Sequence, residues 1–328
     1  NMEYDIAVKE DLKFIPVYVS GMPRKPGLSL IKWFWDLNKS VNSALRYFYT
    51  IKPDVILGTG GYVSGPALLA GIILRIPIII HDPDAHPGIV SRFIAPWAKV
   101  VSVAFEQSKV FLNSKNIVVN GNPIRESFGV VSRETGIKEL GLDPNKKTLL
   151  VVGGSQGAKK INEAMLEASR ILVEEKGFQV IHQTGRKNYD EYIKELSLKW
   201  PEYASCPGYV VRPYFDDMSI PLSAANLAVS RAGSLSISEL CISGLPAILV
   251  PYPFAAQDHQ RYNARAMEKE GAALYLEDPD CSSDKLVDMV EKIFHDEVRL
   301  ESMKRASLNL AKPDSTVEII KLMKKIAK

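Results

Sequence analysis

LLVVGGSQGA, residues Leu149–Ala158, is the stretch that decides the fold. An apolar segment stops at Gly153 and Gly154, a hydroxyl and a third glycine follow, and a helix-like run begins at Lys159. Glycines at such a turn let a backbone come close to a phosphate, and the helix N-terminus adds unpaired N–H groups and the positive end of its dipole. The stretch therefore predicts a phosphorylated ligand at the carboxyl edge of a parallel sheet.

Length and composition describe a globular chain with more than one core. We expect two domains, because 328 residues exceed the size of one ordinary domain. The net charge of +3 is too small to indicate a nucleic-acid partner. Cys206, Cys241 and Cys281 stand far apart, without metal-ligand spacing, and we interpret them as free thiols. The longest apolar run, residues 67–80, is interrupted by an arginine and a proline and is too short to span a bilayer.

Short apolar segments alternate with amphipathic runs along most of the chain, which is typical of parallel sheets wound by helices. The pattern predicts strands at 13–19, 55–57, 76–80, 100–103, 117–119, 148–152, 179–182, 209–211, 227–229, 247–250 and 273–276. It predicts helices at 29–50, 159–175, 190–199, 235–242, 259–270 and 315–328.

An Asn, Gly and Pro cluster at residues 120–124 predicts a boundary between two halves with a cleft between them. Pro313 breaks the last helical region, so we expect the final helix to return to the first half. The predicted domains are therefore residues 1–124 together with 313–328, and residues 125–312.

Further candidate ligand contacts follow other predicted strands. Gly60 and Gly61 form a second glycine loop, which taken alone is equally well a tight turn. Arg231 is suited to neutralise phosphate charge, and we predict Ser234 as the N-cap of the next helix. Glu239, within that helix, is placed to accept hydrogen bonds from sugar hydroxyls, although an acidic residue there also simply suits the helix dipole.

Two more segments carry candidate chemistry. HDPDAHPG, residues 81–88, contains two prolines, which give no regular metal-ligand geometry, so we expect a substrate contact or a general base there. Gln260 and Asn263 share a helix face and suit a sugar.

Trp33 and Trp35 are about 200° apart on a helix, so one face cannot bury both. With lysines nearby they favour a membrane interface, and core packing is the alternative.

With these loops assembled, the chain resembles the MurG family of bacterial peptidoglycan N-acetylglucosaminyltransferases along essentially its whole length. The resemblance rests on PDVILGTGGYVSGP (53–66), GNPIR (121–125), VVGGSQGA (151–158), FDDM (215–218), SRAGSLSISEL (230–240), GLPAILVPYP (244–253) and DHQRYNA (258–264). It implies two facing Rossmann-like domains with parallel sheets, of the GT-B type. It implies inverting transfer of N-acetylglucosamine from UDP-N-acetylglucosamine to lipid I, an undecaprenyl-pyrophosphoryl-N-acetylmuramoyl-pentapeptide, giving lipid II.

The resemblance also implies no metal or other cofactor, an acceptor- and membrane-binding first domain, and a donor-binding second domain. It implies a peripheral place at the anionic cytoplasmic face of the bacterial plasma membrane. The donor-binding positions are Arg125, Ser155, Gln156, Gly157, Phe215, Arg231, Ser234, Leu235, Ser236, Glu239, Gln260 and Asn263. The acceptor-binding positions are Gly60, Gly61, Tyr62 and Asp84, and the membrane positions are Ile31, Trp33, Phe34, Trp35, Ile72, Ile73 and Arg75.

By the same resemblance, Arg125 and Phe215 fall at the uracil, the latter through its backbone. Glu239 matches the ribose-binding carboxylate, and Gln260 and Asn263 match positions that read the N-acetylglucosamine hydroxyls. The catalytic base is not assigned, and the candidates are His81 and Asp82.

The chain departs from the family pattern in three places. The family's first glycine-rich turn has no counterpart, so we expect a truncated N-terminus that lacks a first strand and loop. His81-Asp82-Pro83-Asp84 stands in place of His-Glu-Gln-Asn, and Ser236 in place of a threonine. A UDP-sugar epimerase of the same two-domain plan and an inactive nucleotide-binding fragment stay open as alternatives.

Overall fold

The computed structural model describes residues 2–17, 19–21, 23, 27–154 and 156–327. The first half contains α1 (Met2–Lys9), α2 (Leu28–Ile51), β1 (Ile56–Gly58), η1 (Tyr62–Ser64), α3 (Gly65–Ile73), β2 (Ile78–Asp82), α4 (Ile89–Ile94), η2 (Ala95–Trp97), β3 (Val100–Val103), η3 (Glu106–Phe111) and β4 (Ile117–Val119).

The second half runs from α5 to α12, and a last helix follows it. Its elements are α5 (Arg133–Leu140), β5 (Thr148–Val152), α6 (Lys159–Arg170), η4 (Ile171–Glu175), β6 (Gln179–Gln183), α7 (Tyr189–Lys199), η5 (Pro201–Ser205), β7 (Tyr209–Arg212), α8 (Ser219–Ala224), β8 (Leu227–Ser230), α9 (Ser234–Ile242), β9 (Ala247–Leu249), η6 (Ala256–Asp258), α10 (His259–Lys269), β10 (Ala273–Tyr275), η7 (Asp278–Asp280), α11 (Ser283–Phe294) and α12 (Glu297–Leu310), followed by α13 (Ser315–Ile326).

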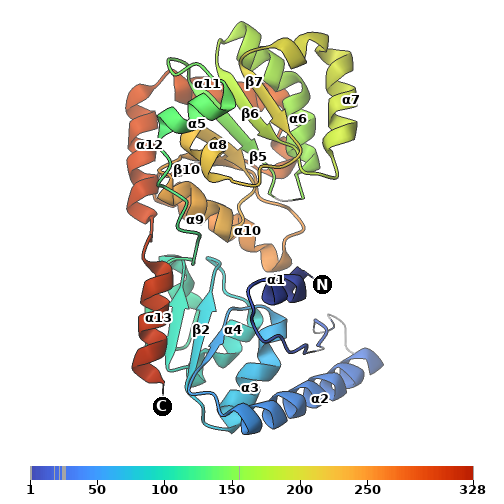
Figure 1. Cartoon of the computed structure of the whole chain (residues 1–328), viewed down its shortest axis with the longest axis vertical. Helices are drawn as coiled ribbons and strands as arrows, with labels where there is room; N and C mark the ends of the chain where they lie inside the picture. The colour runs from blue at the N-terminus through green and yellow to red at the C-terminus, as the bar shows by residue number, and fades with distance from the viewer. Residues whose placement is uncertain (1, 18, 22, 24–26, 155, 328) are drawn as a thin grey trace.

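Within the described residues, the strands form two parallel sheets, of order β1-β2-β3-β4 and β10-β9-β8-β5-β6-β7. Figure 1 places the first sheet in the lower part of an elongated molecule and the second in the upper part. This is the α/β architecture of two facing halves that the sequence predicts.

The central strand of the second sheet, β5, is buried on both faces because its side chains are apolar and alternate. Leu149 and Val151 join an apolar cluster with residues of α6 and α11, whereas Leu150 and Val152 join a cluster with residues of α9 and α10. Helices therefore cover both faces of this sheet.

The order of the second sheet reverses between β5 and β8. From β5 the chain winds outward through β6 and β7, then returns to β8 on the other side and continues through β9 and β10. Val152 and Ser230 pair at the ends of β5 and β8, so the turns that follow leave the sheet side by side. In open α/β sheets, ligands bind at such a reversal point.

The predicted strand at residues 13–19 is wrong. The described residues 12–17 pair with no strand, and Tyr18 lies outside the described residues. Pro16 has no N–H to donate to a sheet, and Lys13 and Ile15 are exposed. The other predicted strands agree with the structure within two residues at each end.

Two segments connect the halves, residues 120–124 and residues 311–314, and both cross on the left in Figure 1. The Ser315 hydroxyl donates a hydrogen bond to the Gly121 carbonyl oxygen at 2.7 Å. Gly121 has a φ of +78°, and a Cβ there would overlap Lys312. α13 therefore returns along the first half. No helix in the described part of the chain is long and apolar enough to cross a membrane.

Candidate functional site

The turn after β5 packs backbone to backbone against the turn after β6. Gly157 has a φ of +77°, and a Cβ on it would overlap the Thr184 carbonyl oxygen. Gly185 has a φ of +87°, and its Cβ would lie 2.5 Å from the Gly157 nitrogen. The Asn188 amide donates to the Gln156 and Thr184 carbonyl oxygens at 3.1 and 3.2 Å. Only glycines allow this approach, which shapes the turn in front of α6.

Of the predicted residues in this turn, Gln156 is exposed and Gly157 is half-buried. The prediction for Ser155 lies outside the described residues.

A buried polar network lies beneath these turns. His182 Nε2 is 3.1 Å from Asn162 Oδ1, and the Asn162 nitrogen donates to the Thr184 carbonyl oxygen at 2.9 Å. On the other side of the ring, Nδ1 lies 3.2 Å from the Tyr192 hydroxyl. Burial lowers the pKa of His182 to about 3, so the ring is neutral. The network fixes the start of α6 and the turn after β6 relative to each other. None of its residues was among the predicted site residues.

The turn after β8 supplies a second helix N-terminus. Gly233, with extended backbone, is the N-cap of α9 and has no side chain to cap it, so the prediction of Ser234 as N-cap is wrong. Ser234 is the first helical residue. The N–H groups of Ser234, Leu235 and Ser236 have no acceptor among the described residues. They stand beside the β5 turn as donors for an anion.

Arg231 is tied at one end of its guanidinium to the segment that follows β9. Its guanidinium donates to the Val250 and Pro251 carbonyl oxygens at 3.0 and 3.2 Å and pairs with Asp278. The side chain is only 12% exposed. These contacts use Nη1 alone. The predicted contact of Arg231 with a diphosphate stays a prediction.

Glu239 presents a carboxylate that accepts no hydrogen bond from the described part of the chain. The side chain is half-buried on α9. Burial raises the pKa of Glu239 to about 7, and the positive charge of Arg125 opposes this shift. A desolvated carboxylate with unused oxygens is suited to accept hydrogen bonds from vicinal hydroxyl groups.

The two predicted uracil contacts lie on different elements. Arg125 is exposed directly after the connecting segment 120–124, and it is near enough to Glu239 to influence the pKa of that carboxyl group. Phe215 follows β7 and is buried, and its backbone N–H donates to Gln183 Oε1 at 2.8 Å. Its N–H is therefore already used by Gln183.

In the first half, the glycine loop after β1 lies against the end of β2. Gly60 and Gly61 have φ of +83° and +71°, and a Cβ on Gly60 would lie 3.8 Å from Asp82 Oδ2. Tyr62, which begins η1, is exposed. Of the predicted acceptor residues, Gly60 thus lies beside the end of β2, where the loop that contains Asp84 begins.

Asp82 is a buried brace for the loop between β2 and α4. Its Oδ1 accepts from the Asp84 N–H at 3.3 Å and its Oδ2 from the Gly88 N–H at 3.1 Å. Burial is the main influence and raises the pKa of Asp82, while these two hydrogen bonds favour the charged form. The contacts favour a structural role, and proton transfer by Asp82 stays a prediction.

His81 is also buried, and both of its ring nitrogens are engaged. Nδ1 lies 3.0 Å from Ser102 Oγ and Nε2 3.1 Å from Asn122 Oδ1. The Asn122 nitrogen faces the oxygens of Ser234 and Ser238, so the ring proton belongs on Nε2. Burial lowers the pKa of His81, and the ring is neutral. A role for it as the catalytic base likewise stays a prediction.

Several side chains join the halves directly. Asn122 donates to the Ser234 carbonyl and the Ser238 hydroxyl, at 3.3 and 3.1 Å. Asn263, on α10, is completely buried and contacts Asp84 and its neighbour in the first half. The carboxyl edges of the two sheets therefore face each other.

Predicted sugar contacts lie at the start of α10. Gln260 Oε1 accepts from the Tyr252 N–H at 2.9 Å. Just before the helix, Gln257 and Asp258 both have positive φ, of +52° and +58°. Consecutive left-handed residues other than glycine are uncommon and cluster at functional sites. Arg92 of α4 donates to Gln257 Oε1 at 2.8 Å, which ties this strained turn to the first half.

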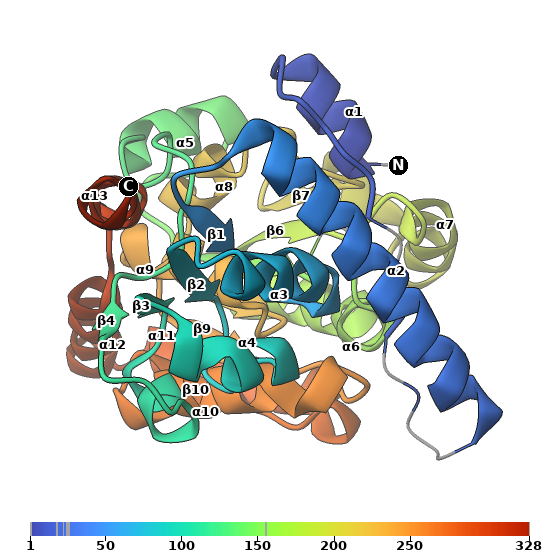
Figure 2. The same cartoon turned by 90° about the horizontal axis from the view of Figure 1, so that it is seen from below.

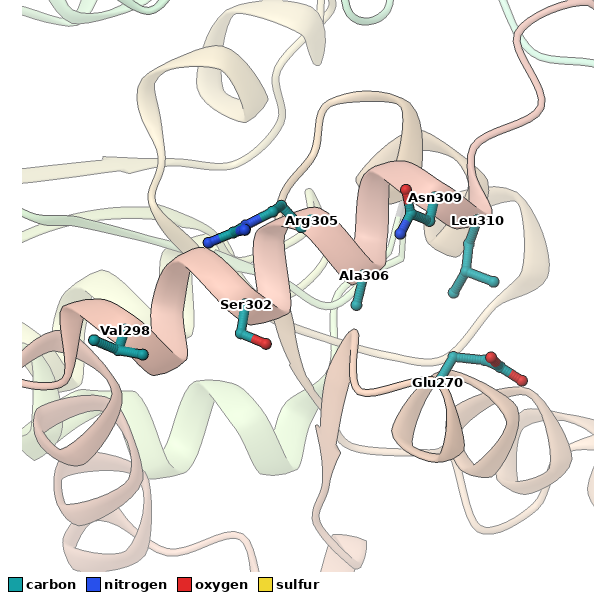
Figure 3. A pocket seen from close by; sticks show the side chains of 7 residues that line it. All are labelled: Glu270, Val298, Ser302, Arg305, Ala306, Asn309 and Leu310. Carbon is teal, nitrogen blue, oxygen red and sulfur yellow. The ribbon is translucent and has the colours of Figure 1, made fainter.

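A large surface depression lies away from this edge. Figure 3 shows it between α12 and the end of α10, with a volume of about 480 Å³. Its charged side chains, Glu270 and Arg305, point away from each other, so its charged groups do not converge. A cavity of about 290 Å³ lies between the halves beside Asn122 and Ser238. Among the described residues, no three His, Cys, Asp or Glu side chains gather as metal ligands.

The predicted membrane residues lie on α2 and α3, which Figure 2 shows beside α4 on the end of the first half. Trp35 is 75% exposed and Ile73 60% exposed. Ile31, Phe34 and Arg75 are exposed as well. The predicted residues therefore leave apolar side chains in contact with solvent on the first part of α2 and at the end of α3.

Two predicted membrane residues are less exposed. Trp33 is half-buried, with its indole N–H donating to the Ser20 carbonyl at 2.8 Å, and Ile72 packs against the core of the first half. Three exposed apolar residues on α4 and η2 were not among the predicted membrane residues. They recur every four residues, a spacing that is visible in the sequence and could have indicated one exposed helix face: Ile89, Phe93 and Trp97.

Comparison with known proteins gives the same picture. Residues 1–103 match the glycosyltransferase family 28 N-terminal domain and residues 148–319 its C-terminal domain. A "UDP-N-acetylglucosamine--N-acetylmuramyl-(pentapeptide) pyrophosphoryl-undecaprenol N-acetylglucosamine transferase" of Desulforamulus reducens is 37% identical over 326 residues, 99% of this chain and 88% of the relative.

Solved structures resemble the whole chain as well. The crystal structure of Acinetobacter baumannii MurG has a TM-score of 0.75 and 27% identity, covering 99% of this chain and 88% of that one. UDP-GlcNAc 2-epimerase from Neisseria meningitidis has a TM-score of 0.63 and 14% identity, covering 99% and 89%, and shares the fold alone. The chain therefore belongs to glycosyltransferase family 28 and, within it, to the MurG enzymes.

Proposed function

We propose that this chain transfers N-acetylglucosamine from UDP-N-acetylglucosamine to lipid I, forming lipid II for peptidoglycan synthesis. The observation that carries the proposal is the reversal point of the second sheet. There the turns after β5 and β8 stand side by side, each in front of a helix N-terminus. Identity of 37% along nearly the whole chain to a transferase of this name supports the substrates.

In this proposal, the diphosphate of the donor lies between the starts of α6 and α9. Their unpaired N–H groups and dipoles would stabilise the negative charge that develops on the leaving UDP. A hydroxyl of the acceptor attacks the anomeric carbon, the bond from that carbon to the phosphate oxygen breaks, and the configuration inverts. The hydroxyl proton passes to a base that the contacts of His81 and Asp82 do not identify.

We assign the acceptor and the membrane to residues 1–124 with 313–328, and the donor to residues 125–312. Glu239 would accept the ribose hydroxyls, and Arg125 and the Phe215 backbone would hold the uracil. Gln260 and Asn263 would read the sugar. The unused oxygens of Glu239 and its closeness to Arg125 support the nucleoside part of this assignment.

The transfer is tested by incubating the protein with sugar-labelled UDP-N-acetylglucosamine and lipid I in detergent micelles. We expect label to move into the lipid fraction, because the donor turns and the facing acceptor loop belong to one site. A UDP-sugar epimerase would leave the label on the nucleotide while changing the sugar. A lipid fraction free of label, with or without an altered nucleotide sugar, would remove the proposed function.

We also propose that the exposed apolar face of α2, α3 and α4 rests on the anionic cytoplasmic surface of the bacterial plasma membrane. Large apolar side chains in water at one end of a protein mark an interaction site. Aromatic residues with lysines nearby are suited to the boundary between headgroups and acyl chains. Trp35, which is 75% exposed, is the strongest candidate for insertion.

Replacing Ile31 and Trp35 together by serine is expected to weaken partitioning to anionic vesicles by about tenfold or more, because two inserted apolar side chains are lost. Sedimentation with vesicles measures the effect. The matched control is Val298→Ser, which removes an equally accessible apolar side chain, 81% exposed, from the second half. Equal partitioning of all three proteins would refute the assignment of this face, while transfer in detergent should be unaffected by any of these changes.

A further inference from the structure

The side-chain amide of Asn263, which is predicted to bind the donor sugar, is occupied by hydrogen bonds within the protein. Its Oδ1 accepts from the Ala85 N–H at 2.7 Å, and its nitrogen donates to Asp84 Oδ1 at 2.8 Å and to the Ala232 carbonyl at 3.1 Å. Both N–H bonds of the amide and its oxygen are therefore engaged. Asn263 is also 0% exposed, so in this arrangement no donor of its side chain is free for a sugar hydroxyl.

The Asp84 side of this contact is held firmly. The Asp84 N–H donates to the buried carboxylate of Asp82, and the Ser108 hydroxyl donates to the Asp84 carbonyl at 2.9 Å. These two bonds fix the backbone on either side of the Asp84 side chain. The carboxylate is thus presented to Asn263 by a braced loop, and a charge-assisted hydrogen bond of this kind is stronger than one between neutral groups.

We propose that Asp84 is a positioning residue that latches the two halves together through Asn263, and that the sugar of the donor must displace this latch. The inference rests on the proposed function, in which Asn263 reads the N-acetylglucosamine group. The UDP part is placed at Glu239 and at the β5 and β8 turns, and none of these contacts involves Asp84. UDP therefore binds with the latch closed, whereas UDP-N-acetylglucosamine binds only after Asn263 has exchanged a carboxylate for a neutral hydroxyl.

The same geometry links the donor to the acceptor. Asp84 belongs to the loop at which the acceptor is proposed to bind, and Gly60 lies beside the start of this loop. An acceptor group that takes over the Asp84 carboxylate would release the Asn263 amide for the donor sugar. The latch would then favour the complete pair of substrates over the sugar nucleotide alone.

The test compares two ligands by calorimetry, UDP and UDP-N-acetylglucosamine, with the whole chain. We expect Asp84→Ala to tighten the dissociation constant of UDP-N-acetylglucosamine by roughly three- to thirtyfold and to leave that of UDP unchanged. Asp84→Asn keeps a neutral oxygen for the Asn263 amide and should give an intermediate ratio of the two constants. The control is Asp54→Ala, an exposed aspartate of the first half, which should leave the ratio as it is.

The ratio of the two constants separates a latch from general damage to the fold, which would weaken both ligands together. An unchanged ratio in Asp84→Ala, or weaker binding of UDP-N-acetylglucosamine alone, overturns the latch. Should Asp84→Ala fold poorly, Asp84→Asn decides by the same ratio. If the unaltered protein binds neither ligand, the proposed function fails, and the latch fails with it.

Discussion

Gly157→Ala is expected to destabilise the protein by about 2–5 kcal/mol and to abolish measurable donor binding. The estimate combines about 1–2 kcal/mol for a side chain at positive φ with about 1–3 kcal/mol for overpacking. At residue 157 both terms apply, because φ is +77° and the new Cβ would overlap the Thr184 carbonyl oxygen. The turn can only relieve this overlap by moving away from β6, which displaces the donors in front of α6.

The neighbouring glycine of the same turn gives a matched control. Gly154 has a φ of +83°, but a Cβ on it would meet no atom within 4 Å. Gly154→Ala should therefore cost only about 1–2 kcal/mol, from the backbone conformation alone. Denaturant unfolding followed by circular dichroism measures both stabilities, and calorimetry with UDP measures binding. Equal stability of the two variants would show that the close approach of the turns is not what residue 157 requires.

Glu239→Ala is expected to weaken UDP binding by roughly ten- to hundredfold, the loss of hydrogen bonds from the ribose hydroxyls to a charged acceptor at about 1.5–3 kcal/mol. Glu239→Gln should lose nearly as much, since it keeps the size of the side chain but not its charge. The sugar nucleotide gives a second readout, because its diphosphate is esterified on both sides and does not titrate near neutral pH. Unchanged affinity in Glu239→Ala would refute the ribose assignment.

The pH dependence follows from the pKa of Glu239, which burial raises to about 7 in the free protein. Because the ligand favours the charged carboxylate, affinity for UDP-N-acetylglucosamine should fall as the pH drops through about 7, by up to about tenfold per pH unit. Glu239→Gln should abolish this dependence between about pH 6 and pH 8. The raised pKa of Glu239 also affects the free energy of unfolding. The folded protein holds the proton of Glu239 more tightly than the unfolded chain does, and the stability gained from this is lost as the pH rises through about 7. Glu239→Gln should therefore unfold less easily than the original protein at alkaline pH.

Much of the fold could be predicted because each strand carries its own signal. β3, β4 and β5 begin and end at the predicted residues, since short β-branched runs bounded by turn residues define them locally. The predicted strand at 13–19 had the same apolar composition but contains Pro16, and composition does not reveal whether a sheet partner is available. A β-strand needs backbone hydrogen bonds from a neighbouring strand, and the sequence of one segment does not reveal whether that neighbour is present.

The candidate site was predictable where it depends on turns and not where it depends on contact between the halves. The glycine turn after β5 was predicted from its sequence, and Gly157 has the positive φ that such a turn uses. The role of Glu239 came from the resemblance and stays a prediction. That Asn263 reaches Asp84, 179 residues away, follows only from the packing of two sheets. The helix α9 also begins one residue earlier than a serine cap would place it, with Gly233 at the cap position and Ser234 inside the helix.

The single crossing region of the chain determines how the halves are able to move. Residues 121 and 312 are in contact, and Ser315 binds Gly121, so both connections share one pivot instead of forming two separate tethers. The two halves can then move relative to each other by rotating about the line through these contacts. Asn122 directly follows Gly121 at the pivot, so a given rotation changes the distances to its hydrogen-bond partners only slightly. Arg92 and Gln257 form a hydrogen bond between the halves outside this pivot, so a rotation that separates α4 from the turn before α10 breaks it.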